Sequence, residues 1–327
     1  MDGVFKRRKD RKGALAVATV LASVLCAILF FSSGTASADW SPLIERLTAD
    51  RFDDQSVREI FSRPEVQFDP SIMSRKISSL IRKRFEKPWP DGPRKFKNIY
   101  EVYMKPEVIA GARSYLQENR GILDKVKAQY GVPREIVVSI LLVETRLGEY
   151  VGERGAFNTL ASMALCTDLE TIRPYISAEL LDSDSEDFVR RRLRQKSDWA
   201  YNELKSLIIY AKKGGIDPLS IPGSIYGAIG ICQFMPSHAA NFGVDADRDG
   251  RVDLFSKSDA LFSIANYLRG NGWKARMSRE RKHKVIKAYN PSNIYANTVL
   301  AVADKLTVKP AVKKALKKRP QQILNPA

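Results

Sequence analysis

The stretch PREIVVSILLVETRL, residues 133–147, sets an acid at the end of an apolar run. Pro133 suits the first turn of an α-helix, because its missing N–H is not needed there. From Val137 onward, apolar residues recur at three- and four-residue steps and lead to Glu144. This spacing predicts an amphipathic helix with the Glu144 carboxylate on or beside its apolar face.

The position of Glu144 allows two interpretations. Removal from water disfavours the anion and raises the pKa of a carboxyl group, which suits a general acid that works near neutral pH. The alternative is a buried ion pair between Glu144 and Arg146 or another cation. This helix alone does not separate the two.

Helical spacing also dominates the rest of the chain, so the predicted fold class is mostly α. A loop with three prolines, EKPWPDGPRKFKN, interrupts the pattern at residues 86–98, and glycine stops are expected at Gly131 and near Gly215. Residues 167–197 are highly charged and predict a solvated, helix-rich insertion. The other helical segments are residues 41–85, 105–130, 198–215, 258–273 and 293–306.

The first 38 residues have the three-part order of a secretory signal peptide. A basic start precedes an uncharged, mostly apolar run, and Ala36-Ser37-Ala38 is a small-x-small cleavage site before Asp39. We therefore expect export to the periplasm. The apolar run is long for a signal, so a retained membrane anchor is the alternative. Residues 39–306 then form the main domain, and residues 307–327 form a basic tail.

The net charge of the chain is +17, and six basic residues against two acidic ones assign +4 of it to the first 38 residues. The remaining +13 predicts attraction to polyanions such as cell-wall polymers. The sequence has no basic motif interleaved with aromatic residues, so nucleic acid is not an expected partner. Export leaves Cys166 and Cys232, which either form a disulfide or remain as two core thiols.

A glycine-marked segment, GSIYGAIGICQFMPSH at residues 223–238, is the second candidate for a site. Glycines allow a ligand to approach the backbone, while Ser224 and Gln233 supply hydrogen bonds. The alternative is a tight loop in which the glycines serve turns only. Asn290, in the AYN of residues 288–290, has no assigned role from its own surroundings.

The third candidate is an acidic loop, DADRDGRVDLFS at residues 245–256. Its pattern fits the first half of an EF-hand loop, in which Asp253 takes the ninth place and Ser256 takes the twelfth place that normally holds a bidentate Glu. The loss of that Glu weakens the expected Ca²⁺ site, although Asp259 lies about one helical turn further on. An acidic turn without metal is the alternative. The predicted ligands are Asp245, Asp247, Asp249, Arg251 through its carbonyl, and Ser256.

Taken in order, these segments resemble the lytic transglycosylases of the membrane-bound lytic murein transglycosylase B family. The resemblance rests on SILLVETRLGEYVG, GSIYGAIGICQFMPS, the acidic loop, DALFSIANYLRGNGW and AYN, and it runs from about Trp40 to Leu306. It implies a lysozyme-like, α-rich domain with an elaborated substrate cleft. It also implies that Glu144 is the single catalytic acid, that Ser224, Gln233 and Asn290 bind substrate, and that the acidic loop is an EF-hand-like Ca²⁺ site.

The activity implied by this resemblance is non-hydrolytic cleavage of the β-1,4 bond between N-acetylmuramic acid and N-acetylglucosamine in peptidoglycan, which leaves 1,6-anhydro ends. No cofactor is required for that chemistry, and Ca²⁺ would be structural. Peptidoglycan strands are the expected partner of a monomer, with the membrane or other cell-wall enzymes as further partners. A lysozyme-type hydrolase that uses Glu144 and a non-catalytic wall-binding scaffold are the alternatives.

Overall fold

The computed structural model describes residues 38–85 and 99–307. The predicted signal segment up to Ser37, the proline-rich loop at 86–98 and the tail from residue 308 lie outside the described residues. The described residues from Ser41 onward form one compact unit, and the few described residues before Ser41 belong to another unit.

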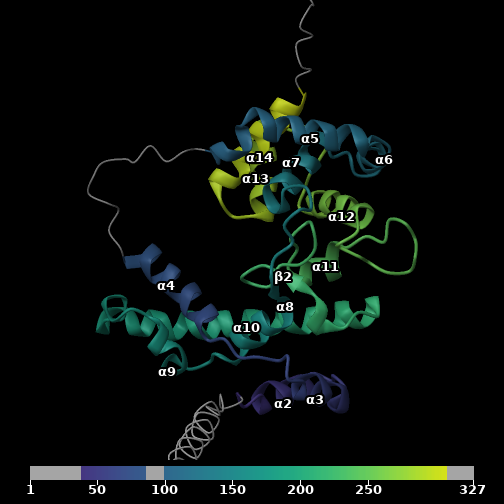
Figure 1. Ribbon diagram of the computed structural model, residues 1–327. Helices are drawn as coiled ribbons and strands as arrows, with labels where there is room; N and C mark the ends of the chain where they lie inside the picture. The colour runs from purple at the N-terminus through teal and green to yellow at the C-terminus, as the bar shows by residue number, and fades with distance from the viewer. Residues whose placement is uncertain (1–37, 86–98, 308–327) are drawn as a thin grey trace, which may run out of the picture. The chain divides into compact units, whose positions relative to one another are not determined.

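The described unit is built almost entirely from helices (Figure 1). Its first part contains α2 (Ser41–Ala49), α3 (Asp54–Ser62), α4 (Ser71–Phe85), the 3-10 turn η1 (Glu101–Met104), α5 (Pro106–Glu118), α6 (Arg120–Tyr130) and α7 (Arg134–Thr145). Its second part contains α8 (Ala156–Leu165), α9 (Leu169–Ile172), α10 (Ser183–Gly214), α11 (Pro236–Phe242), α12 (Lys257–Gly270), α13 (Arg279–Tyr289) and α14 (Asn293–Thr307). The mostly α fold class is therefore confirmed.

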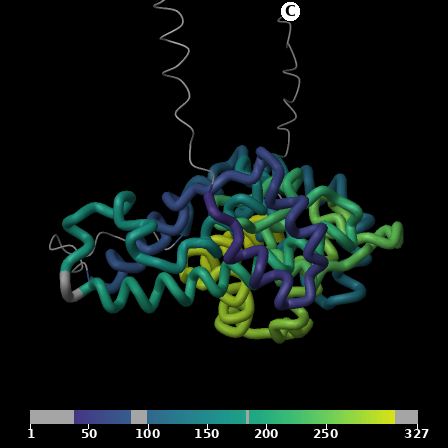
Figure 2. The backbone as a smooth tube through the Cα atoms, turned by 90° about the horizontal axis from the view of Figure 1, so that it is seen from below, coloured from purple at the N-terminus to yellow at the C-terminus, as the bar shows by residue number. Residues whose placement is uncertain are grey.

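The predicted glycine stops are present, but one predicted helix boundary is wrong. Gly131 and Gly215 both adopt left-handed conformations, with φ of 68° and 63°, at the ends of α6 and α10. The charged end of the insertion and the segment from Asp198 form one helix, α10, of 32 residues, which Figure 2 shows as a continuous coil. Leu193, Ser197 and Ala200 are all buried along it, so apolar packing continues across the expected break.

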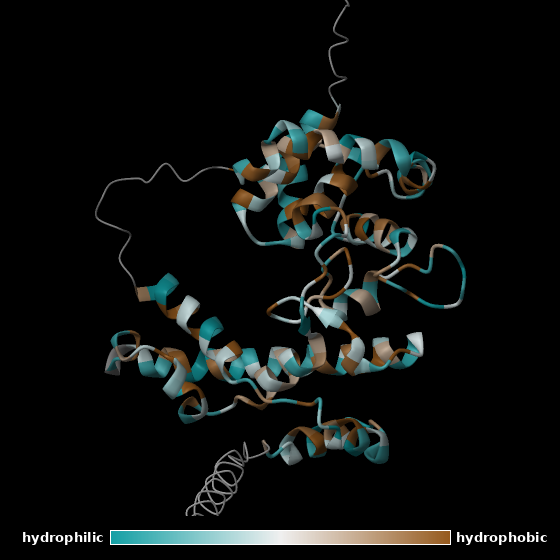
Figure 3. Cartoon of the chain, in the orientation of Figure 1, coloured by the Kyte–Doolittle hydropathy of each residue, from teal (hydrophilic) through white to brown (hydrophobic). Residues whose placement is uncertain are grey.

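Helix α7 is the apolar centre of one group of helices. It packs against α5, α6, α12 and α14, and the side chains of Val137, Val138, Ile140 and Leu141 are fully buried. Figure 3 shows α7 as mainly hydrophobic, in contrast to the more hydrophilic α10. In a second group, α10 packs against α4, α8 and α11, and α11 also contacts α12.

Cys166 and Cys232, the two cysteines that follow the predicted signal segment, are free and buried, so they do not form a disulfide. Burial raises the pKa of each thiol to about 12. Both thiols therefore stay protonated in the folded protein at neutral pH.

A short antiparallel pairing fixes the loop after α7 to the glycine-marked segment. Strand β1 (Arg154–Gly155) pairs with β2 (Pro222–Gly223). Gly152 lies just before this pairing with φ of 99°, and a Cβ atom there would come within 2.1 Å of the carbonyl oxygen of Gly223. Only glycine fits at this close approach.

Replacement of Gly152 by alanine is expected to lower the free energy of unfolding by about 3 kcal/mol, because it adds both backbone strain and a clash with backbone. Gly111→Ala is the matched control. Gly111 lies in the exposed middle of α5, with nothing within 4 Å of an added Cβ, so alanine should raise stability by about 0.5–1 kcal/mol. Urea unfolding of both variants measures the difference, and equal stability of Gly152→Ala and the parent would refute the close approach.

Candidate active site

Glu144 lies in the last turn of α7 and is only partly exposed. The Tyr295 hydroxyl of α14 donates a hydrogen bond of 2.6 Å to Glu144 Oε1. Burial raises the pKa of Glu144 from 4.5 to about 7, and the Tyr295 hydrogen bond opposes part of this rise. A substantial fraction of Glu144 is therefore protonated at neutral pH, as a general acid requires.

The structure decides against the ion-pair interpretation of Glu144. Within residues 38–85 and 99–307, Glu144 makes no salt bridge, and no cation contributes to its pKa shift. Arg146 instead places its guanidinium over the ring of Tyr150, 5.1 Å from the centroid. Arg146 also has φ of 51°, which turns the chain away at the end of α7.

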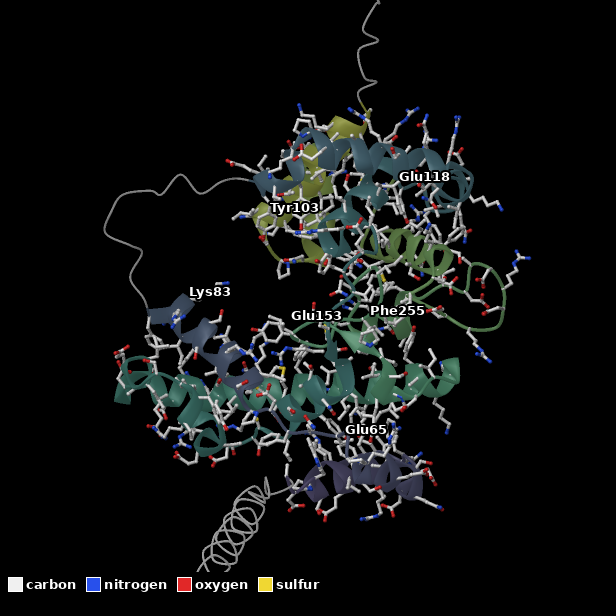
Figure 4. All side chains as sticks on the ribbon, in the orientation of Figure 1. Glu65, Lys83, Tyr103, Glu118, Glu153 and Phe255 are labelled. Carbon is white, nitrogen blue, oxygen red and sulfur yellow. The ribbon has the colours of Figure 1, made fainter. Side chains whose placement is uncertain are left out.

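Three tyrosines surround the Glu144 carboxyl group. Tyr289 and Tyr295 stack with nearly parallel rings, 6.5 Å between centroids, and Tyr103 donates a hydrogen bond of 3.1 Å to the carbonyl of Val143. Burial raises the pKa of all three hydroxyls, and the nearby Glu144 adds to each rise. Figure 4 labels Tyr103 on η1, which precedes α5. All three phenols stay protonated and can donate hydrogen bonds.

The residues next to Glu144 and Asn290 hold the loop that carries Gln233. Thr145 Oγ1 donates a hydrogen bond of 2.6 Å to the carbonyl of Ile231, and the Tyr289 hydroxyl donates to the carbonyl of Cys232. Because each anchor is the chain neighbour of a predicted site residue, these bonds bring Glu144, Gln233 and Asn290 to one region of the structure.

Gln233 has a strained backbone and a well-fixed side chain. Its φ is 51°, in the left-handed region that few residues other than glycine adopt. Its amide nitrogen donates to the carbonyls of Gly230 at 3.0 Å and Val151 at 3.2 Å. These bonds offset the strain and leave the side-chain oxygen free to accept a hydrogen bond from a ligand.

Ser224 lies at a tight turn connected to the same loop. Its hydroxyl oxygen accepts hydrogen bonds from the backbone N–H groups of Ala228 at 3.0 Å and Tyr226 at 3.3 Å. Backbone bridges then run from Gly223 through Ile229 to Phe234. The Ser224 side chain thus stabilises the turn, as expected if this segment is a tight loop. Its hydroxyl proton is still available to donate a hydrogen bond to a ligand.

Asn290 ends α13 in an extended conformation, with φ of −141° and ψ of 119°. Its backbone carbonyl accepts a hydrogen bond of 2.7 Å from the N–H of Ser292, and its side chain is partly exposed. Asn290 follows Tyr289 in the sequence, and the Tyr289 ring stacks on that of Tyr295, which is hydrogen-bonded to Glu144. Asn290 is therefore the chain neighbour of a tyrosine near Glu144.

No second carboxyl group among the described residues influences the pKa of Glu144. Glu149 and Glu153, the acids that follow it in sequence, are both exposed, and Figure 4 labels Glu153 in the loop before β1. The arrangement therefore offers one proton donor rather than the carboxylate pair of most glycoside hydrolases.

A cavity of about 400 Å³ opens beside the end of α7, where η1, α5 and α7 meet. Tyr103 and Leu142 line it, together with Arg146 and Leu147. Glu144 does not line this cavity, but Tyr103 belongs to both the cavity and the surroundings of Glu144. The cavity offers space for part of a ligand next to the candidate acid.

The acidic loop gathers a carboxylate cluster that differs from the set predicted from the sequence. One carboxylate oxygen from each of Asp245, Asp247 and Asp259 lies within 4.8 Å of the others. Asp259 is buried, and its two oxygens accept hydrogen bonds from the N–H groups of Ala246 and Asp253. Three carboxylates at this spacing are hard oxygen donors that fit Ca²⁺.

The other predicted ligands have different contacts in this structure. The Asp249 carboxylate accepts a hydrogen bond from the N–H of Arg251. Ser256 caps the N-terminus of α12 by accepting from the N–H of Asp259, at 3.3 Å. This cap starts α12 at the end of the acidic loop, so Asp259 lies on the first turn of the helix. There its carboxylate faces the loop, in the place that the twelfth residue of an EF-hand normally takes.

A curated relative, two solved structures and one family model are all similar to this chain. A curated relative, membrane-bound lytic murein transglycosylase B of Escherichia coli K12, is 28% identical over 223 residues, which cover 68% of this chain and 54% of that protein. The chain thus matches about half the length of this relative.

Two solved structures share the fold. The E. coli lytic transglycosylase Slt35, in complex with calcium, matches with a TM-score of 0.61 and 19% identity, over 84% of this chain and 94% of that one. SltB3 of Pseudomonas aeruginosa, in complex with NAG-NAM-pentapeptide, matches with a TM-score of 0.60 and 21% identity, over 82% and 78% of the two chains.

The model of one protein family matches residues 35–282, well over half of the chain, and this range contains Glu144, Ser224, Gln233 and the acidic loop. The chain therefore belongs to the transglycosylase SLT domain family.

Proposed function

We propose that the protein is a peptidoglycan lytic transglycosylase and that Glu144 is its single general acid and base. The observation that carries this proposal is one partly buried carboxyl group with a pKa of about 7, hydrogen-bonded to Tyr295, whose pKa no second carboxyl group of the described residues shifts. The family match and the murein-cleaving relative support the same activity.

In the proposed reaction, protonated Glu144 donates its proton to the glycosidic oxygen as the bond to the anomeric carbon of N-acetylmuramic acid breaks. Positive charge develops on that carbon, and the N-acetyl group of the same sugar stabilises it. The Glu144 anion then removes the proton from the C6 hydroxyl, whose oxygen attacks the anomeric carbon. The product is a 1,6-anhydro ring, Glu144 is protonated again, and no water or cofactor is consumed.

The remaining polar residues orient the sugar. The free proton of Ser224 and the side-chain oxygen of Gln233 offer one donor and one acceptor to sugar hydroxyl or N-acetyl groups. We assign the Asn290 amide the same type of contact. Tyr295 positions the Glu144 carboxyl group and, by opposing the effect of burial, keeps its pKa near neutrality.

The proposed substrate is a glycan strand of alternating NAG and NAM that carries peptides. A structure with the same fold, SltB3, was determined in complex with NAG-NAM-pentapeptide. Such a substrate lies outside the cytoplasmic membrane, in agreement with the proposed export.

None of the helices within the described ranges combines the length and apolar character needed to cross a membrane.

We also propose that Asp245, Asp247 and Asp259 bind a structural Ca²⁺ ion. Their carboxylates converge, burial raises the pKa of Asp259, and the Slt35 structure of the same fold contains calcium. A divalent cation would stabilise the charged form of Asp259 and so the acidic loop.

Glu144→Gln is expected to lower the rate of glycan cleavage by about a thousandfold or more, since the amide can neither donate nor accept the proton. The measurement is the release of fragments from purified peptidoglycan, followed by mass spectrometry of the new ends. Wild-type protein should yield 1,6-anhydro ends.

Glu153→Gln is the matched control, because Glu153 is an exposed carboxylate of the same size. It should retain wild-type activity. Reducing ends in place of anhydro ends would identify a hydrolase, and binding of the wild type without any cleavage would identify a scaffold. Either result contradicts the proposed reaction.

For the metal, Ca²⁺ at about a hundredfold above its Kd should raise the melting temperature by on the order of 5 °C. Asp247→Asn should remove most of this shift, because it deletes a charge from the cluster. Asp304→Asn, which removes an exposed carboxylate paired with Arg279, should leave the shift intact. A wild-type melting temperature unaffected by Ca²⁺ would show that the cluster does not bind this ion.

A further inference from the structure

Helix α4 is strongly basic and lies next to the glycine-marked loop. Its sequence, SIMSRKISSLIRKRF, has five basic residues and no acidic one. One face, with Ile72, Ile77 and Ile81, is buried, and α4 packs against α8 and α10. The cations of α4 are therefore not balanced within the helix.

Lys76 of α4 reaches the turn that carries Ser224. Its ammonium group lies over the ring of Tyr226, 4.1 Å from the centroid. Tyr226 is two residues from Ser224, and the intervening Ile225 is 52% exposed at the tip of the turn. A cation–π contact thus connects α4 to a proposed substrate-binding residue.

A second lysine, Lys196, lies on α10, which packs against α4. Lys196 places its ammonium group 5.2 Å from the ring centroid of Trp199. Burial lowers the pKa of Lys76, and the positive charge of Lys196 lowers it further. Both side chains are partly buried.

Neither lysine has an acidic partner among the residues that the structure describes. Asp198, the acid nearest to Lys196 in sequence, pairs with Arg46 instead, at 2.9 Å. Two neighbouring ammonium groups, partly removed from water and held on aromatic rings, repel each other in the free protein. An anion that binds between them relieves this repulsion.

We infer that Lys76 and Lys196, with Tyr226 and Trp199, form a binding site for the carboxylates of the peptide on the glycan strand. This inference rests on the proposed function, since it takes Ser224 as a contact to the sugar and adds a peptide site next to the turn that carries Ser224. Within a peptide-substituted strand the sugar rings are neutral, and the peptide carries the negative charge. The site therefore selects glycan that still bears its peptides over bare or amidated strands.

Binding to the full-length Glu144→Gln variant tests the inference without turnover. The two probes are NAG-NAM-pentapeptide and the same compound with its carboxylates converted to primary amides, both measured by calorimetry. The free acid should bind about tenfold more tightly than the amide, as expected for charge-assisted hydrogen bonds. Added Lys76→Met or Lys196→Met should bring this ratio close to one, and Lys76→Arg should largely restore it.

Lys125→Met is the charge-matched control, because Lys125 is an exposed cation on α6. It should leave the ratio at its parent value. Equal affinity for acid and amide in the parent, or a ratio that survives both methionine variants, overturns the inference. Because the readout is binding, its failure is distinct from failure of the proposed reaction, which would appear as a lack of anhydro ends from the wild type.

Discussion

The proposed chemistry depends on how α7 and α14 hold one carboxyl group. The apolar environment at the end of α7 penalises the Glu144 anion, while the Tyr295 hydrogen bond limits the penalty. The folded pKa of about 7 exceeds the unfolded value of 4.5, so the folded state loses stability as pH rises through this window. The loss is on the order of 3 kcal/mol above neutral pH. The fold tolerates this cost to keep a proton available.

In the same region, side chains that have no proposed part in the reaction fix the candidate site residues. Thr145 and Tyr289 bind successive carbonyls of the loop before Gln233. The short β1–β2 pairing connects the chain after α7 to the segment that contains Ser224. Helix α7 and helix α13 thus meet the glycine-marked segment through hydrogen bonds from side-chain hydroxyls to backbone carbonyls. These bonds fix the positions of the candidate site residues next to them.

Much of this could be predicted from the sequence because local rules apply. Apolar spacing places Glu144 on its helix, and glycine marks the ends of α6 and α10. Other features depend on tertiary packing. Tyr295 has the same helical spacing as a core aromatic residue, so only the contact between α14 and α7 reveals its hydrogen bond to Glu144.

The length of α10 and the part that Asp259 takes in the carboxylate cluster both depend on tertiary packing. The charged residues at 167–197 indicate a separate insertion. In the structure, buried residues lie among the charged ones after Ser183, and the helix continues through them to Gly214. In the acidic loop, the pattern assigns the twelfth place to Ser256. The structure uses Ser256 as a helix cap, and this cap turns Asp259 toward Asp245 and Asp247. The loop pattern points to Asp259 only as a residue about one helical turn further on, and the packing of α12 places its carboxylate in the cluster.

An NMR titration of the Glu144 carboxyl carbon shows whether this side chain retains its proton up to about neutral pH. Selective ¹³C labelling of glutamate, with Glu144→Gln to assign the signal, gives the pKa in the intact protein. We expect a value of about 7 and a higher value in Tyr295→Phe, where the stabilising hydrogen bond to the anion is lost. A Glu144 pKa near the ordinary value of 4.5, unchanged in Tyr295→Phe, would contradict this expectation.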